Sequence, residues 1–179
     1  FYLAVEGAAT TGDEVVDGQY CICADFPLDG ERLVAFAYDD GYCLEYFHQP
    51  VQAYWKKDGK TIEAAIAEAM AEYPVLMQRC RDFSDGMRRE ATEKGGTEYA
   101  ELLELAYRQI MAGHKLAVAP DGNLLYISKE CFSNGCAATV DITYPSAPMY
   151  LKYNPQLVAA MLRPVFRFAR SEGWKYDFA

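Results

Sequence analysis

Histidine and basic residues are scarce in this chain of 179 residues. It has two histidines, and 17 Lys and Arg residues stand against 26 Asp and Glu, which gives a formal net charge of −9 at pH 7. His48 and His114 form no H-x-x-x-H spacing, so we expect no metal site. The negative charge disfavours a non-specific grip on nucleic acid or anionic lipid. We therefore expect no nucleic acid partner and no cofactor.

Long apolar segments are also lacking. No run approaches the roughly 20 apolar residues that a membrane-spanning helix needs, and no charged start with an apolar core marks a signal peptide. The hydrophobic class makes up 51% of the residues, which indicates a folded core. The chain opens on "FYLAVEG" without Met and closes on "GWKYDFA". We therefore expect it to be a piece of a longer protein.

Cysteine is sparse, with six residues and no C-x-x-C pair. A disulfide scaffold is not needed in a chain of this size, so we expect most or all of the cysteines to be reduced. A zinc site can be drawn from Cys131, Cys136 and His114, and either thiol can be drawn as a nucleophile. The spacing is atypical of zinc sites, and a reactive thiol needs exposure and a depressed pKa. Small buried cysteines are the favoured interpretation.

Residues 1–57 have the pattern of strands and turns. "QYCICADF" and "RLVAFAYDD" are short runs rich in aromatic and branched residues, which favours β-strands. "PLDGER" between them carries a D-G pair, typical of a tight connection. We predict a small sheet here.

Residues 58–179 have a helical pattern. Thr61 is a candidate N-cap for a helix that Pro74 is expected to kink or split and that "EKGG" ends. A second helix is predicted over 97–117, with His114 near its end, so that the two helices form an antiparallel hairpin. The fold class is therefore α+β, with N-terminal strands followed by helical hairpins.

The remaining elements follow from turn and capping residues. "APDGNLLYIS" predicts a turn and then a strand. Ser146 is a candidate cap for a short helix that ends at Tyr153. Asn154 at the N-cap and Pro155 at the first helical position predict the last helix, in which Pro164 should cause a kink.

The segment "SKECFSNGCAATVDITYPSAP", residues 128–148, has neither a strand nor a helix period and gathers most of the polar candidates. Glu130 and Asp141 lie near Lys129, Asn134 and Tyr144, and a folded loop can bring two carboxyls to one cleft as acid and base. The simpler interpretation is that Asp141 caps a turn or helix and that Glu130 is a solvated charge.

Two further candidates have equally simple alternatives. Asp39, in the turn "AYDDGY", and the aromatic pair Tyr54 and Trp55 are typical of small polar-ligand sites, but also of a seam between domains. Ser128 next to Lys129 lacks the S-x-x-K spacing that places both residues on one helix face.

Three segments together resemble the glutaminase A family, which occurs in fungi and Bacteroidetes. They are "EYAELLELAYRQIMAGHKL", "PDGNLLYISKECFSNGCAATVDITYPSAP" and "YNPQLVAAMLRPVFRFARS". They are similar to the first part of its six-helical-hairpin domain, and "FAYDDGYCLEYF" with "AYWKKDGKTI" resembles the strand-rich segment before it. The resemblance implies a partial (α/α) toroid in an extracytoplasmic multidomain enzyme that hydrolyses L-glutamine to glutamate and ammonia.

The resemblance also selects residues within the loop. Lys129, Glu130, Asn134, Asp141, Tyr144 and Ser146 match the recurring patterns S-K-E-x-x-S-N-G and V-D-x-T-Y-P-S-A-P. It implies Asp141 or Glu130 as the base, Lys129 or Asn134 as the polarising group, and Asn134, Tyr144, Ser146 and Asp39 as candidate substrate contacts. The cysteines depart from the pattern. Because the family's chain continues into further hairpins, we expect this piece alone to have little or no activity.

Two other interpretations stay open on the sequence. A toroid of helical hairpins with acidic residues next to aromatic ones is also typical of glycoside hydrolases, whose paired carboxyls lie across a cleft. In that case the substrate is a sugar. Alternatively, the segment is purely structural or binding, and acts only with the remaining domains of its own chain. Fold analogy does not decide among the three.

Overall fold

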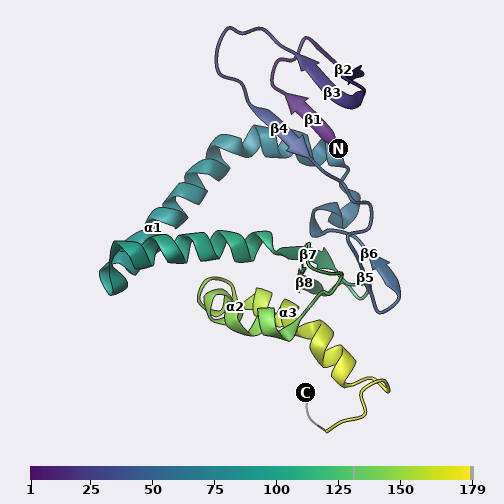
Figure 1. Ribbon diagram of the computed structural model, residues 1–179, viewed down its shortest axis with the longest axis vertical. Coiled ribbons are helices and arrows are strands. Elements are labelled where there is room, and N and C mark those ends of the chain that lie inside the picture. The colour runs from purple at the N-terminus through teal and green to yellow at the C-terminus, as the bar shows by residue number, and fades with distance from the viewer. Residues whose placement is uncertain (131, 178–179) are drawn as a thin grey trace. The chain divides into compact units, whose positions relative to one another are not determined.

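The computed structural model describes residues 1–130 and 132–177 (Figure 1). The chain divides into two compact units: Phe1–Gly41 with Asp58–Arg79, and Tyr42–Lys57 with Cys80–Ala179. Antiparallel strands precede helices along the chain, so the predicted α+β class is confirmed.

Two antiparallel strand pairs form the β part of the first unit. β1 (Tyr2–Val5) pairs with β4 (Val34–Ala37), and β2 (Thr10–Val16) pairs with β3 (Gln19–Asp25). The strands predicted over 19–26 and 32–40 are confirmed, but they do not pair with each other. Asp17 and Gly18, both with positive φ (50° and 79°), supply the tight turn that joins β2 to β3.

The long helix α1 (Ile62–Ala112) begins after Thr61, whose Oγ1 accepts a hydrogen bond from the Ala64 N–H at 3.2 Å. This confirms the predicted N-cap. α1 continues through Pro74 and is interrupted at Gly96, where φ is 83° and ψ is 178°. A residue with a Cβ rarely adopts this positive φ, so glycine is required where the helix reverses.

The segments on either side of Gly96 form the predicted hairpin within the second unit. Arg88 pairs with Glu104, and the rings of Phe83 and Tyr107 lie 5.1 Å apart. Phe83 precedes Arg88 in the first arm, whereas its partner Tyr107 follows Glu104 in the second arm. The two arms are therefore antiparallel. The second arm ends at Ala112, so the predicted end at residue 117 is wrong.

Two strand pairs and two helices complete the second unit. β5 (Leu44–Tyr46) pairs with β6 (Gln49–Val51), and β7 (His114–Val118) pairs with β8 (Leu124–Ser128). A short 3₁₀ helix, η1 (Tyr54–Gly59), leads toward α1. One side of the β7–β8 pair contributes to a core that also contains residues of β5 and β6, with these buried members: Cys43, Tyr46, Val51, Ala53, Ala117, Ala119, Leu125 and Ile127.

The other core joins β8 to the helices α2 (Val140–Tyr153) and α3 (Pro155–Ala169). Tyr126, Tyr150 and Met161 are among its buried members. Asn154 is the N-cap residue of α3 and Pro155 its first residue, as predicted. α2 ends at Tyr153, as predicted, but it begins at Val140, so the predicted cap at Ser146 is wrong.

Packing explains why α2 forms despite two internal prolines, at 145 and 148. Thr143, Ser146 and Tyr150 are buried at spacings of three and four residues, so they form one face of the helix. The Ser146 hydroxyl donates to the backbone carbonyls of Ile142 (2.8 Å) and Thr143 (3.0 Å). Burial of this face outweighs the unfavourable prolines.

Glu90 links the hairpin of α1 to α2. Its Oε2 accepts from Nζ of Lys152 and its Oε1 from Nζ of Lys94, both at 2.6 Å. The bond from Lys152, followed by that from Lys94, lowers the pKa of Glu90 from 4.5 to about 2. The ionised carboxylate therefore favours the folded state.

A Glu90→Gln variant tests this link. Because the folded-state pKa lies below the unfolded one, the contribution of Glu90 is present above pH 4.5 and lost as the pH falls toward 2. We expect Glu90→Gln to flatten the pH dependence of the unfolding free energy in this range, measured by chemical denaturation. Glu93→Gln, at an exposed position of the same helix, is the control and should keep the wild-type slope. A wild-type slope in Glu90→Gln would contradict the assignment.

Candidate functional site

The segment after β8 is a loop closed at its base by backbone hydrogen bonds. Lys129 N–H donates to the Gly113 carbonyl (2.9 Å), Ala138 N–H to the Ser128 carbonyl (3.0 Å), and Glu130 N–H to the Cys136 carbonyl (3.3 Å). We call residues 129–139 the SKE loop. These hydrogen bonds hold the two ends of the loop together where it joins β8. The loop is therefore ordered at its base, although its sequence has neither a strand nor a helix period.

Glu130 is the internal anchor of the SKE loop. Oε1 accepts from the Thr139 hydroxyl at 3.2 Å, and the Ser133 hydroxyl lies within hydrogen-bond distance of both Oε2 (3.1 Å) and the backbone carbonyl of Glu130 (2.9 Å). The residue is half-buried. The simpler interpretation of Glu130 as a freely solvated charge is therefore wrong, because both oxygens are used to hold the loop.

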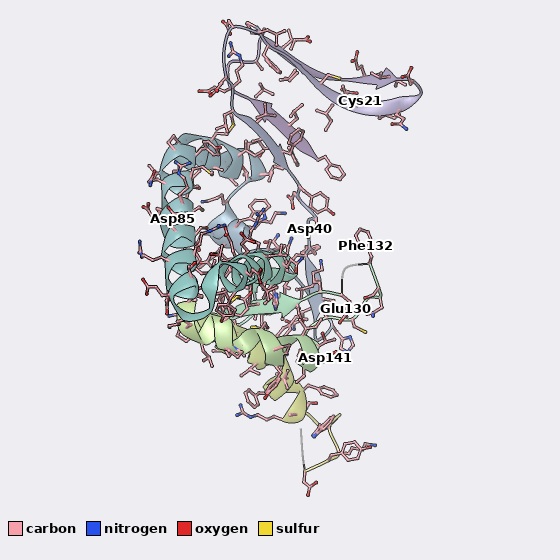
Figure 2. The ribbon with its side chains drawn as sticks, turned by 60° about the vertical axis from the view of Figure 1, so that its left-hand side comes forward. Cys21, Asp40, Asp85, Glu130, Phe132 and Asp141 are labelled. Carbon is pink, nitrogen blue, oxygen red and sulfur yellow. The ribbon has the colours of Figure 1, made fainter. Side chains whose placement is uncertain are left out.

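Asp141 lies in the first turn of α2 and is exposed (Figure 2). The N-cap residue is Thr139, whose carbonyl accepts from the N–H groups of Ile142 (3.3 Å) and Thr143 (3.1 Å), so Asp141 is not the cap. A helix N-terminus favours a negative charge. Since Thr139 also holds Glu130, the fold brings both carboxylates to the N-terminal end of α2.

The other predicted site residues have different surroundings. Asn134 accepts from the Cys136 N–H through Oδ1 at 2.7 Å, and its Nδ2 lies 3.4 Å from the Ser133 hydroxyl. Lys129 is exposed. Tyr144 is 81% exposed on α2. The SKE loop and the start of α2 therefore bring Lys129, Glu130, Asn134 and Asp141 into one region, with Tyr144 one turn further along the helix.

Two other predicted residues make local hydrogen bonds. Ser146 is 2% exposed, and its hydroxyl is directed to the backbone of its own helix. Asp39 belongs to the first compact unit, where its Oδ1 accepts from the Gly41 N–H at 2.8 Å and stabilises a turn. Both side chains thus have local structural roles.

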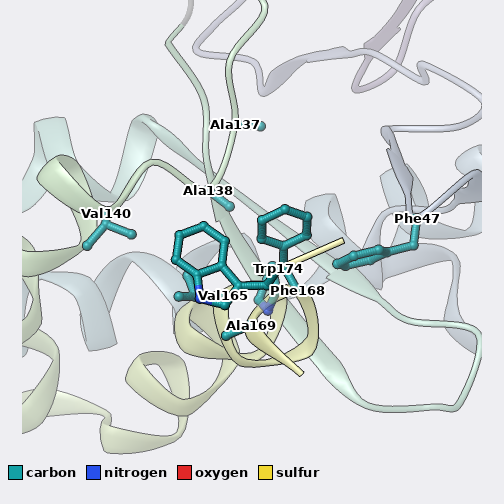
Figure 3. A pocket seen from close by; sticks show the side chains of 9 residues that line it. Phe47, Ala137, Ala138, Val140, Val165, Phe168, Ala169 and Trp174 are labelled. Atoms are coloured by element: carbon teal, nitrogen blue, oxygen red, sulfur yellow. The ribbon is translucent and has the colours of Figure 1, made fainter. Parts of the chain in front are cut away.

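Sequence reasoning missed an apolar hollow of about 390 Å³ beside the SKE loop (Figure 3). Ala137 and Ala138 of the loop and Val140 of α2 line one part of it. The rest of the lining consists of residues of α3 and of two aromatic residues outside it. The α3 residues are Pro164, Val165, Phe168 and Ala169, and the two others are Phe47 and Trp174. Phe47 is far in sequence from Phe168 and Trp174, so no local pattern indicated that they meet.

His114 is the first residue of β7 rather than part of a helix. Its Nδ1 contacts the Ile110 carbonyl at 2.6 Å, and its ring stacks on Tyr126 with centroids 4.6 Å apart. Burial lowers its pKa, so the ring is neutral at pH 7.

The prediction of small buried cysteines is wrong for one cysteine of the SKE loop. Cys136 is exposed, and Cys131 lies outside the described residues. Within residues 1–130 and 132–177, no group of three or more His, Cys, Asp or Glu side chains is placed to hold a metal ion. The helices in the same ranges include none with the length and apolarity of a membrane span.

Comparison with known families identifies the part of the chain that carries this site. Residues 96–179 match the family model of the glutaminase A six helical-hairpin domain. This part of the chain is similar to that domain, and we call residues 96–179 the glutaminase A segment. The matched segment contains the second arm of α1, the β7–β8 pair, the SKE loop, α2 and α3. The glutaminase A segment thus includes each of the loop candidates and leaves out Asp39.

Two curated relatives carry glutaminase names. Glutaminase A of Aspergillus oryzae is 29% identical over 122 residues, which is 68% of this chain and 17% of that protein. A probable glutaminase of Arthroderma benhamiae is 32% identical over 97 residues, which is 54% of this chain and 11% of that protein. The chain therefore spans less than a fifth of the length of either glutaminase. No solved structure matches it.

Proposed function

We propose that the full-length protein containing this chain is a glutaminase-like amidohydrolase that converts L-glutamine to L-glutamate and ammonia. The observation that carries the proposal is the placement of Glu130 and Asp141 at the N-terminal end of α2, within the glutaminase A segment. The names of the two relatives supply the substrate, glutamine.

In the proposed reaction, water attacks the carboxamide carbon and Asp141 accepts a proton from it. The tetrahedral intermediate then collapses, the C–N bond breaks, and the proton passes to the leaving nitrogen, which departs as ammonia. A cation or amide N–H near the developing oxyanion lowers the barrier. Lys129 and Asn134 are the candidates for this polarising role.

The surroundings of the two carboxylates support this division of roles. Both oxygens of Glu130 accept hydrogen bonds within the loop, which leaves it poorly placed to take a proton from water. Asp141 is exposed, and its charge is favoured by the helix N-terminus. We therefore propose Asp141 as the base and Glu130 as the residue that holds the loop in shape.

The wider setting is also a proposal. The helical hairpin and the helices α2 and α3 are taken as the first part of a six-hairpin toroid, because the matched family domain is described by six such hairpins. From the resemblance to glutaminase A we also propose that the protein acts outside the cytoplasm. The remaining domains of the same chain are its proposed partners, and they complete the cleft.

An assay of the purified full-length protein tests the proposed activity. Ammonia and glutamate released from glutamine are measured in parallel with reducing sugar released from a panel of glycans. We expect stoichiometric ammonia and glutamate and no reducing sugar. Sugar release without ammonia would favour the glycoside hydrolase interpretation, and neither product would favour a structural segment.

A further inference from the structure

Two buried polar atoms have no hydrogen-bond partner among the described protein atoms. They are Nε2 of His114 and Oγ of Ser128. The two residues face each other across the β7–β8 pair, at one end of the ladder. Directly opposite residues of antiparallel strands project to the same side. Both therefore lie on the side of Tyr126, which packs in the core formed with α2 and α3.

The orientation of the His114 ring is fixed by three neighbours. Nδ1 lies 2.6 Å from the Ile110 carbonyl, the Tyr126 ring stacks on one face, and the Tyr150 ring approaches by its edge at 5.8 Å. Because a carbonyl only accepts hydrogen bonds, Nδ1 carries the proton. Nε2 is therefore an acceptor that is directed away from Ile110 and requires a donor.

Ser128 has the complementary need. Ser128 is 2% exposed. Its hydroxyl can donate one hydrogen bond and accept others. Buried polar groups without partners are rare in folded proteins and reduce stability. The hydroxyl makes no direct bond to Nε2. A small ligand that both donates and accepts satisfies the two atoms together.

We infer that His114 and Ser128 hold one buried water molecule between β7 and the core helices. The water donates to Nε2 of His114 and forms a second hydrogen bond with Ser128 Oγ, which meets the minimum of two polar partners for a buried water. Larger ligands are excluded because both polar atoms, Nε2 and Oγ, are buried. Ser128 is for the same reason not a nucleophile, since substrate has no access to it.

This water site lies at the root of the SKE loop. The Ser128 carbonyl accepts from the Ala138 N–H, and the next residue, Lys129, donates to the Gly113 carbonyl beside His114. A fixed Ser128 therefore fixes both ends of the loop that carries Glu130. Ser128 and His114 are positioning residues, and this functional part of the inference rests on the proposed function.

A high-resolution crystal structure of the full-length protein tests the water site. We expect one water within hydrogen-bond distance of both His114 Nε2 and Ser128 Oγ. The density for this water should disappear in Ser128→Val and persist in Ser171→Ala. Ser171 is the control position because its hydroxyl donates to the Phe168 carbonyl of its own segment. A direct bond between the two side chains, or a dry contact, would overturn the inference.

Two isosteric variants test the positioning role. Ser128→Thr keeps the hydroxyl and Ser128→Val does not, while both side chains have the same shape and favour a strand. We expect Ser128→Val to lower kcat for glutamine by about tenfold, a change of one decade in rate, with KM little changed. Ser128→Thr should stay within about threefold of the wild type, because it retains the hydrogen bond.

The outcomes separate this inference from the proposed function. Equal kcat values for Thr and Val at residue 128, with both variants folded, would show that the hydroxyl does not position the loop. If the wild type releases no ammonia from glutamine, the proposed function fails, and the crystallographic result still decides whether the water is present.

Discussion

Replacing Asp141 by Asn in the full-length protein is expected to lower kcat for glutamine hydrolysis by about a hundredfold or more, the range typical of losing a general base. Asn has nearly the same shape as Asp but cannot accept a proton from water at neutral pH. The exposed position of Asp141 predicts that folding is unaffected. The measurement is the initial rate of ammonia release at saturating glutamine.

Two further variants sharpen this test. Asp85→Asn, at an exposed position of α1, is the matched control and should retain the wild-type rate. Glu130→Gln should lower the rate less than Asp141→Asn, because Glu130 shapes the loop. Wild-type turnover in Asp141→Asn would remove Asp141 from the mechanism, and a larger loss in Glu130→Gln would exchange the two roles.

The largest expected effect on stability comes from Leu125→Ala. Leu125 is 0% exposed in the core shared by β5, β6, β7 and β8. Truncation of a buried leucine removes apolar contacts and leaves a cavity, which costs about 2–5 kcal/mol. We expect a loss of this size in the unfolding free energy, measured by urea denaturation of the transition that includes this unit.

Leu102→Ala is the matched control for Leu125→Ala. Leu102 is 64% exposed on the second arm of α1, so its truncation should change the unfolding free energy by less than about 0.5 kcal/mol. Equal losses in the two variants would show that the β7–β8 pair does not form the core described above.

Local signals predicted the parts of the fold that depend on backbone chemistry. Thr61 caps α1 through its hydroxyl, and Asn154 with Pro155 begins α3. Gly96 adopts a positive φ that interrupts α1. In each case one residue type satisfies a requirement of its immediate neighbours, so the sequence alone is sufficient to identify the boundary.

The errors arose where tertiary packing overrides local preference. The apolar pattern of the second arm of α1 continues into residues 114–118, but these pair with β8 and form a strand. Pro145 and Pro148 disfavour a helix, yet α2 runs through both because one of its faces is buried. The aromatic hollow joins Phe47 to α3, and a contact at that separation has no local signature.

The sequence selected the residues of the candidate site but did not predict their surroundings. The resemblance selected the SKE loop, and the structure brings Glu130 and Asp141 to one end of α2. Burial separates Ser146 from the exposed candidates, and the hydrogen bond from Thr139 to Glu130 distinguishes the surroundings of Glu130 from those of Asp141. These distinctions depend on distances and exposure, which a sequence pattern does not contain.

A crystal structure of the full-length protein with glutamate bound tests the central claim most directly. We predict that the side-chain carboxylate of the product lies within hydrogen-bond distance of the SKE loop, with Asp141 beside the carbon that carried the amide. A product bound away from the loop and from the start of α2 would contradict the assignment of this segment to the active site.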